Sequence, residues 1–93
     1  MQYFGDRIAQ ARFAKGLLAK DLINKLAQNN GTIISPAYMS KIENCTDIPT
    51  VPTIVALCKI LDLPVDEMIE ICKKEEMHAF KLRLETKYRR HLQ

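Results

Sequence analysis

Apolar residues recur every three or four positions along most of the chain, which is the spacing of amphipathic helices. Glycine, asparagine or proline interrupts the pattern at intervals, and these residues end helices. The pattern predicts five short helices, at about residues 4–15, 19–28, 36–44, 51–61 and 65–74. Since no segment carries a strand signal, the predicted fold class is all-α.

A further apolar series follows the fifth predicted helix, with Lys and Arg between its members: Met77, Phe80, Leu84, Tyr88 and Leu92. This spacing predicts an amphipathic sixth helix of about fifteen residues, which is too short to be stable alone in water. We expect it to pack back on the domain, to pair with another copy, or to fray. The predicted organisation is a domain at residues 1–72 and a basic helix or tail at residues 73–93.

The apolar faces of the first four helices also predict the core. Ser35 and Pro36 form a typical helix start, an N-cap followed by proline at the first helical position. The residues that we expect in the core, with no case for a ligand pocket, are Ile8, Leu22, Leu26, Met39, Ile42, Ile54, Leu57 and Leu61.

The charge is distributed unevenly over the 93 residues. Hydrophobic residues make up 47% of the chain and charged residues 27%, as in one small globular domain. Residues 1–72 carry seven Lys/Arg against eight Asp/Glu, a balance of −1, and residues 73–93 carry seven against three, a balance of +4. A polyanion would therefore meet the tail first.

The residues that usually carry catalysis or bind metals are sparse. Cys45, Cys58 and Cys72 form no CxxC pair, so we expect reduced, mostly buried thiols and no zinc site. Both histidines, His78 and His91, lie near the end of the chain, which leaves a nucleophile elsewhere without a base. We expect no enzyme activity, no catalytic residues, no cofactor and no metal.

Two features bear on location. The longest segment free of charge, residues 26–40, contains glutamine, asparagine and proline and is too polar to span a membrane. The first residues lack a basic start followed by an apolar run, so we expect no secretion signal and a cytoplasmic protein.

The third predicted helix separates into two sides at about 100° per residue. Met39 and Ile42 lie on one side, and the other carries small or polar residues, namely Ala37, Ser40, Lys41 and Asn44. Small side chains let a helix enter the major groove of DNA, which is about 12 Å wide. A solvated helix surface has the same pattern, and this alternative stays open on that feature alone.

An ordered string of residues around this helix carries a family resemblance. It runs Gly16-Leu17, Leu22, Ser35-Pro36-Ala37-Tyr38-Met39-Ser40-Lys41-Ile42-Glu43-Asn44, Pro49-Thr50, Ile54, Leu57, Leu61, Leu63 and Asp66-Glu67-Met68. The string, within residues 4–72, resembles the lambda-repressor and Cro type of helix-turn-helix domain. The resemblance implies a five-helix bundle in which the third helix recognises double-stranded DNA. It also implies a sequence-specific transcriptional regulator that binds an inverted repeat as a homodimer.

The resemblance assigns roles by position. Pro36, Ala37, Ser40 and Lys41 would face base edges, with Asn44 at the far end, and Lys41 can donate to guanine O6 and N7. Tyr38 and the helix start at Ser35 would meet phosphate, with Lys20 as a further phosphate contact. Tyr38 has the alternative role of a half-buried lid on the core. Arg12 and Glu43 would form a scaffold ion pair that fixes the third helix.

The chain also departs from the family pattern. Leu18-Ala19 stands where the family often has Ser-Gln for phosphates, and Cys45-Thr46-Asp47 replaces glycine and basic residues after the third helix. The turn before that helix is longer than usual. Because these changes remove phosphate contacts, we expect the bundle alone to bind DNA weakly.

Small size and surplus apolar residues predict a homodimer. The expected interface residues are Val65, Met68, Ile69, Ile71, Phe80, Leu84 and Tyr88. A different function stays open, in which the scaffold is an antitoxin-like protein-interaction module with little specific DNA binding. No membrane partner and no small-molecule ligand are expected.

Overall fold

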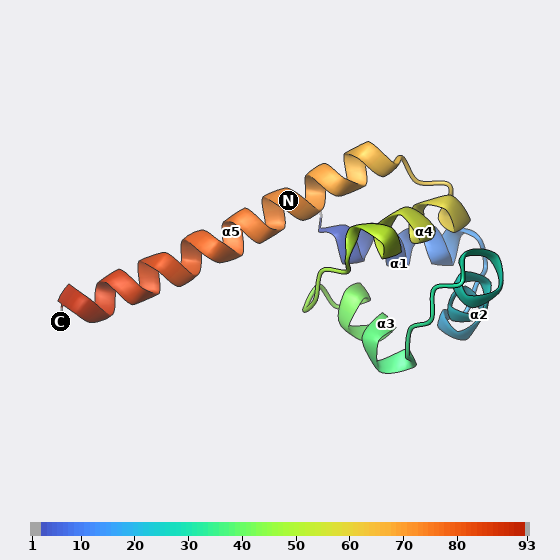
Figure 1. The fold of residues 1–93 in the computed structure, drawn as a ribbon, viewed down its shortest axis with the longest axis horizontal. Coiled ribbons are helices and arrows are strands. Elements are labelled where there is room, and N and C mark those ends of the chain that lie inside the picture. Colours follow the sequence, from blue (N-terminus) through green and yellow to red (C-terminus); the bar gives the residue numbers. More distant parts are fainter. Residues whose placement is uncertain (1–2, 93) are drawn as a thin grey trace.

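The computed structural model describes residues 3–92 of the chain, with side chains as far as residue 87. That part is all-helical and contains no strand, as the sequence predicts. The helices are α1 (Phe4–Ala14), α2 (Ala19–Asn30), α3 (Pro36–Glu43), α4 (Val51–Leu61) and α5 (Val65–Leu92). Figure 1 shows α1 to α4 gathered in a bundle, with the start of α5 packed on it and the rest of α5 projecting away.

Helices α2 and α3 begin and end where the local chemistry dictates. Helix α2 runs two residues beyond the expected end and stops at Gly31, whose φ of +65° is a left-handed conformation that favours glycine. Helix α3 starts after Ser35, whose Oγ accepts a hydrogen bond from the Tyr38 N–H at 3.1 Å. Pro36 occupies the first helical position without losing a hydrogen bond.

The core lies where the apolar stripes predict it. All eight residues expected there are buried, namely Ile8, Leu22, Leu26, Met39, Ile42, Ile54, Leu57 and Leu61. Phe4 of α1, Ala56 and Cys58 of α4, and Met68 and Cys72 of α5 are also buried and complete the core. Helix α5 packs against α4 and α1 through these first turns.

The prediction of a separate sixth helix is wrong, because residues 77–92 continue α5 without a break. Helix α5 has 28 residues and accounts for the elongated shape, with extents of 52 × 25 × 21 Å. The sequence between the two apolar stripes, Lys73-Lys74-Glu75-Glu76, consists of good helix formers with no glycine or proline. The apolar stripe changes its side of the helix there while the backbone stays helical.

Helices α1 and α3 approach each other closely at Gly5. A Cβ at Gly5 would lie 2.1 Å from the Ile42 carbonyl oxygen and 2.9 Å from the Cys45 Sγ. Only glycine allows this backbone separation, since side-chain atoms cannot approach a carbonyl so closely. Gly5 therefore sets how near the C-terminal end of α3 lies to α1.

Glu75 anchors α5 to the start of α1. Its carboxylate accepts a hydrogen bond from the Phe4 N–H, one of the N-terminal donors of α1 that no residue of its own helix satisfies. Tyr3 at the N-cap provides no side-chain hydrogen bond, so Glu75 replaces a local cap. Burial raises the pKa of Glu75 above its ordinary value against the lowering effect of this hydrogen bond, and the charge of Asp6 raises it further.

Candidate nucleic-acid interface

The outward side of α3 is open to solvent. Met39 and Ile42 point into the core, whereas the residues expected to meet DNA bases are exposed, namely Pro36, Ala37, Ser40, Lys41 and Asn44. Ser35 at the helix start is exposed as well. In Figure 1, α3 lies at the lower edge of the bundle, while α5 leaves the bundle in another direction. The predicted division of α3 into a core side and a free side is thus confirmed.

Polar groups on the free side have few partners within the protein. The Asn44 side-chain amide donates to the Ser40 Oγ at 3.2 Å, so these two side chains lie together on the outer surface. Among residues 3–87, the Lys41 ammonium forms no ion pair. Lys41 therefore presents a free positive charge beside a neutral hydrogen-bonding pair.

A paired arginine and glutamate hold α3 against α1. Arg12 Nε donates to Glu43 Oε2 at 2.8 Å and Nη2 donates to Oε1 at 2.8 Å, which is bidentate geometry. The remaining nitrogen, Nη1, donates to the Leu17 carbonyl at 2.9 Å. The two side chains are only 11% and 13% exposed, so the pair is largely removed from water. The expected ion pair between Arg12 and Glu43 is present.

This pairing also changes the electrostatics of Arg12. The hydrogen bonds to Glu43 raise the pKa of the guanidinium, partly opposed by burial, and the carboxylate charge raises it further. The guanidinium carbon lies 4.7 Å from the centre of the Phe13 ring, a cation–π contact. Arg12 therefore serves the packing of α1 and α3 and offers no free charge to a ligand.

Tyr38 is half-buried and packs against the core. Burial raises the pKa of its hydroxyl above the ordinary value, with a further contribution from the charge of Asp47. The Tyr38 ring thus covers the core, which is the alternative role that the sequence analysis considered for it. The phenol remains protonated at neutral pH and can donate a hydrogen bond.

Lys20 lies exposed in the first turn of α2. The N-cap residue of α2, Leu18, supplies no side-chain cap, and its N–H donates to the Asp21 carboxylate at 2.9 Å. An acidic group therefore stands in the first turn of α2, close in sequence to Lys20, the expected phosphate contact.

The chain leaves α3 through a left-handed residue that is not glycine. Cys45 has a φ of +63°, a conformation that costs a residue with a Cβ roughly 1 kcal/mol or more. The Lys41 carbonyl at the end of α3 accepts from the Thr46 N–H at 3.0 Å and from the Thr46 hydroxyl at 3.1 Å. Glycine is the favoured residue at such a position, and Cys45 adopts the conformation with a Cβ.

The three thiols are free and differ in exposure. Cys58 and Cys72 are buried, as expected, but Cys45 is exposed. Burial raises the pKa of all three thiols, to about 12 for Cys72. No three His, Cys, Asp or Glu residues of the described chain gather into a potential metal site.

The expected dimer residues fall into separate groups. Met68 is fully buried in the protein's own core, so its assignment to a dimer interface is wrong. Val65, Ile69 and Ile71 are partly buried against the same core, whereas Phe80 and Leu84 are exposed. The side chain of Tyr88 lies outside the described residues. An apolar stripe does not reveal whether its own domain or a partner covers it.

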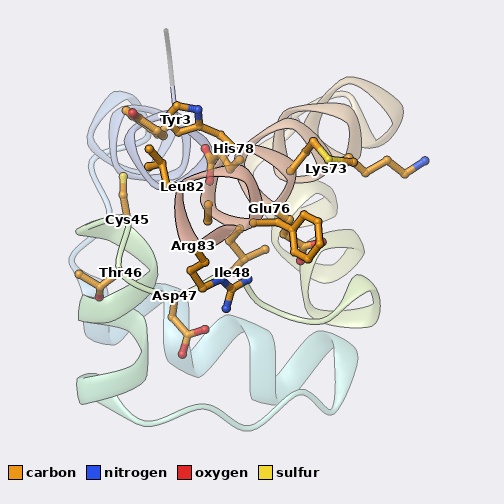
Figure 2. Close-up of a pocket in the computed structure, with 14 residues that line it drawn as sticks. Tyr3, Cys45, Thr46, Asp47, Ile48, Lys73, Glu76, His78, Leu82 and Arg83 are labelled. Atoms are coloured by element: carbon orange, nitrogen blue, oxygen red, sulfur yellow. The ribbon is translucent and has the colours of Figure 1, made fainter. Parts of the chain in front are cut away.

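A surface hollow that the sequence did not indicate lies between α5 and the loop after α3. Its volume is about 1050 Å³. Figure 2 shows Cys45, Thr46, Asp47 and Ile48 of the loop on one side and Glu76, His78, Leu82 and Arg83 of α5 on the other. The projection of α5 creates this hollow, and only its continuity as one helix could have revealed it.

None of the described helices combines the length and apolar character needed to cross a membrane.

Comparison with known proteins provides no relative. No protein-family model matches the chain, and neither the curated proteins nor the solved structures contain a match.

Proposed function

We propose that this chain is a sequence-specific DNA-binding transcriptional regulator whose helix α3 enters the major groove. The observation that carries the proposal is the free side of α3, where Ser40 and Lys41 stand exposed while the opposite side is locked into the core. A recognition helix needs this combination, because its exposed side chains contact the DNA bases while its backbone must be held in place by the core.

The proposal includes a lambda-repressor-like arrangement of the bundle. Helix α2 packs against α3, and the Arg12–Glu43 pair fixes α3 on α1. In this arrangement α2 and α3 form the helix-turn-helix, and the α3 start at Ser35 lies against a phosphate. Lys41 donates to a guanine, and Ala37 contacts a thymine methyl group.

The same surface accounts for weak binding by one copy. Lys41 is the only Lys or Arg in α3, and Asp47 follows soon after. Because phosphate contacts by cations supply most of the affinity, a single bundle binds weakly. We propose that two copies bind an inverted repeat whose half-sites are about 34 Å apart, one turn of the duplex.

Selection from a random duplex library at low salt tests the proposal. Wild type is expected to enrich an inverted repeat, and Lys41→Ala is expected to relax the preference at one position of each half-site. Lys59→Ala is the matched control, because it removes an exposed lysine from α4. The absence of any enriched sequence would contradict the proposal and favour the protein-interaction module.

A further inference from the structure

The projecting half of α5 carries a stripe of exposed apolar side chains. Met77, Phe80 and Leu84 are 56%, 51% and 37% exposed. At about 100° per residue, the three lie within roughly 60° of one another on the helix. Glu75, which bonds to Phe4 of the bundle, lies on roughly the opposite side. The stripe therefore lies on the side of α5 away from its contact with α1, and its residues Met77 and Phe80 also border the hollow between α5 and the loop after α3.

This half of α5 also lacks packing of its own. Cys72 is the last buried residue in the described part of the chain, and each side chain at positions 76–87 is exposed. Helices that make no tertiary contacts are marginal in water at this length. A contact on the stripe would supply the missing stabilisation.

We propose that a second copy of this chain covers the stripe, so that two α5 helices pair in parallel. The spacing of Met77, Phe80 and Leu84 is that of successive a, d and a positions of a heptad repeat. In that register Glu76 occupies position g and Lys81 the following position e. A parallel pair brings g of one helix beside the next e of the other, so Glu76 faces Lys81 of the second copy twice.

Charge favours this orientation over the reverse one. An antiparallel pair places e beside e, where Lys74 and Lys81 would repel each other, and g beside g, where Glu76 and Arg83 would attract, so its repulsions and attractions offset. In the parallel pair, Glu76 and Lys81 attract across both edges, and both are exposed and form no ion pair among residues 3–87. The complementarity is thus between this helix and a parallel copy of itself.

The apolar seam has a defined start. One heptad before Met77 and Phe80, the corresponding positions are Glu70 and Lys73, which pair within the same helix at 3.4 Å. The seam therefore begins where α5 leaves the bundle (Figure 1). Parallel pairing would place the two bundles at the same end of the pair. The inference specifies the dimer of the proposed function but stands on α5 alone.

Sedimentation equilibrium of the full chain tests the pairing without DNA, so this inference and the proposed function can fail separately. Wild type is expected to dimerise, and Glu76→Lys or Lys81→Glu alone to weaken the dimer about fivefold or more, since each replaces two attractions by repulsions. An equimolar mixture of the two variants is expected to form heterodimers of near wild-type affinity. Single variants that dimerise as tightly as wild type, or a mixture that stays monomeric, would overturn the inference.

Two exposed apolar residues provide a matched comparison on the same helix. Phe80 and Leu82 are 51% and 50% exposed and both line the hollow of Figure 2, but only Phe80 belongs to the stripe. Phe80→Ser is expected to abolish the dimer and Leu82→Ser to leave it intact, with helix content followed by circular dichroism. A monomeric wild type, or a dimer lost only in Leu82→Ser, would contradict pairing through the stripe.

Discussion

Arg12 of α1 and Glu43 of α3 are joined by two parallel hydrogen bonds, each 2.8 Å long, at a site where both side chains are almost fully buried. The third guanidinium contact, to the Leu17 carbonyl, extends this link to the loop between α1 and α2. One arginine thus joins three parts of the bundle, and α3 cannot rotate on α1 without breaking a charged pair.

Removing one member of this pair leaves the other charge buried without a partner. Glu43→Ala is expected to lower the free energy of unfolding by about 2–4 kcal/mol, which urea denaturation measures. Lys15→Ala, which removes the more exposed pair between Lys15 and Asp62, is the control and should cost less than about 1 kcal/mol. The double variant Arg12→Met with Glu43→Met should cost less than Glu43→Ala, since it leaves no unpaired charge. A larger cost for the double variant would contradict this account.

Gly5→Ala tests the close approach of α1 and α3. In an exposed helix, alanine is more favourable than glycine by about 1 kcal/mol. At this position the new methyl group would lie 2.1 Å from the Ile42 carbonyl oxygen, so we expect a loss of at least about 2 kcal/mol. Gly16→Ala is the control, because its site is open but its φ is +67°, and it should cost about 1 kcal/mol. Thermal unfolding measures both, and a stabilised Gly5→Ala variant would show that the helices are farther apart.

Glu75 predicts a dependence of stability on pH. Its pKa is raised in the folded protein, so the folded state binds the proton more tightly than the unfolded state does, and stability falls as pH rises through that interval. Glu75→Gln keeps an oxygen that accepts from the Phe4 N–H and carries no charge. The variant should be more stable than wild type at pH 7, and its advantage should shrink as pH falls toward 4. Thermal unfolding across this range would contradict the account if wild type were the more stable protein at pH 7.

Local periodicity predicted the helices and the core, since an apolar residue every third or fourth position describes one helix and its buried side. The N-cap at Ser35 is likewise a local property. So is the division of α3 into a buried side with Met39 and an exposed side with Lys41. The Arg12–Glu43 pair came from the resemblance, because nothing in the spacing of two residues 31 positions apart indicates a contact.

Contacts between segments that are far apart in the chain could not be predicted from the sequence. The bond between Glu75 and Phe4 spans 71 positions, and the hollow beside α5 depends on the direction in which that helix leaves the bundle. Helical spacing indicates that Met68 is covered but not whether its own core or a partner covers it, and the structure buries it in the core. The sequence did not predict that α5 is continuous. Its apolar stripe moves to a different side of the helix near residues 73–76, and such a change in the hydrophobic pattern looks the same as the end of one helix and the start of another.

The central claim, that the free side of α3 contacts DNA, is tested most directly by amide NMR shifts of the full chain titrated at low salt with a mixed-sequence duplex. The account predicts that the largest shift changes fall at residues 35–44 and that Lys41→Ala reduces them. Changes confined to residues 73–92, or no changes at all, would contradict it.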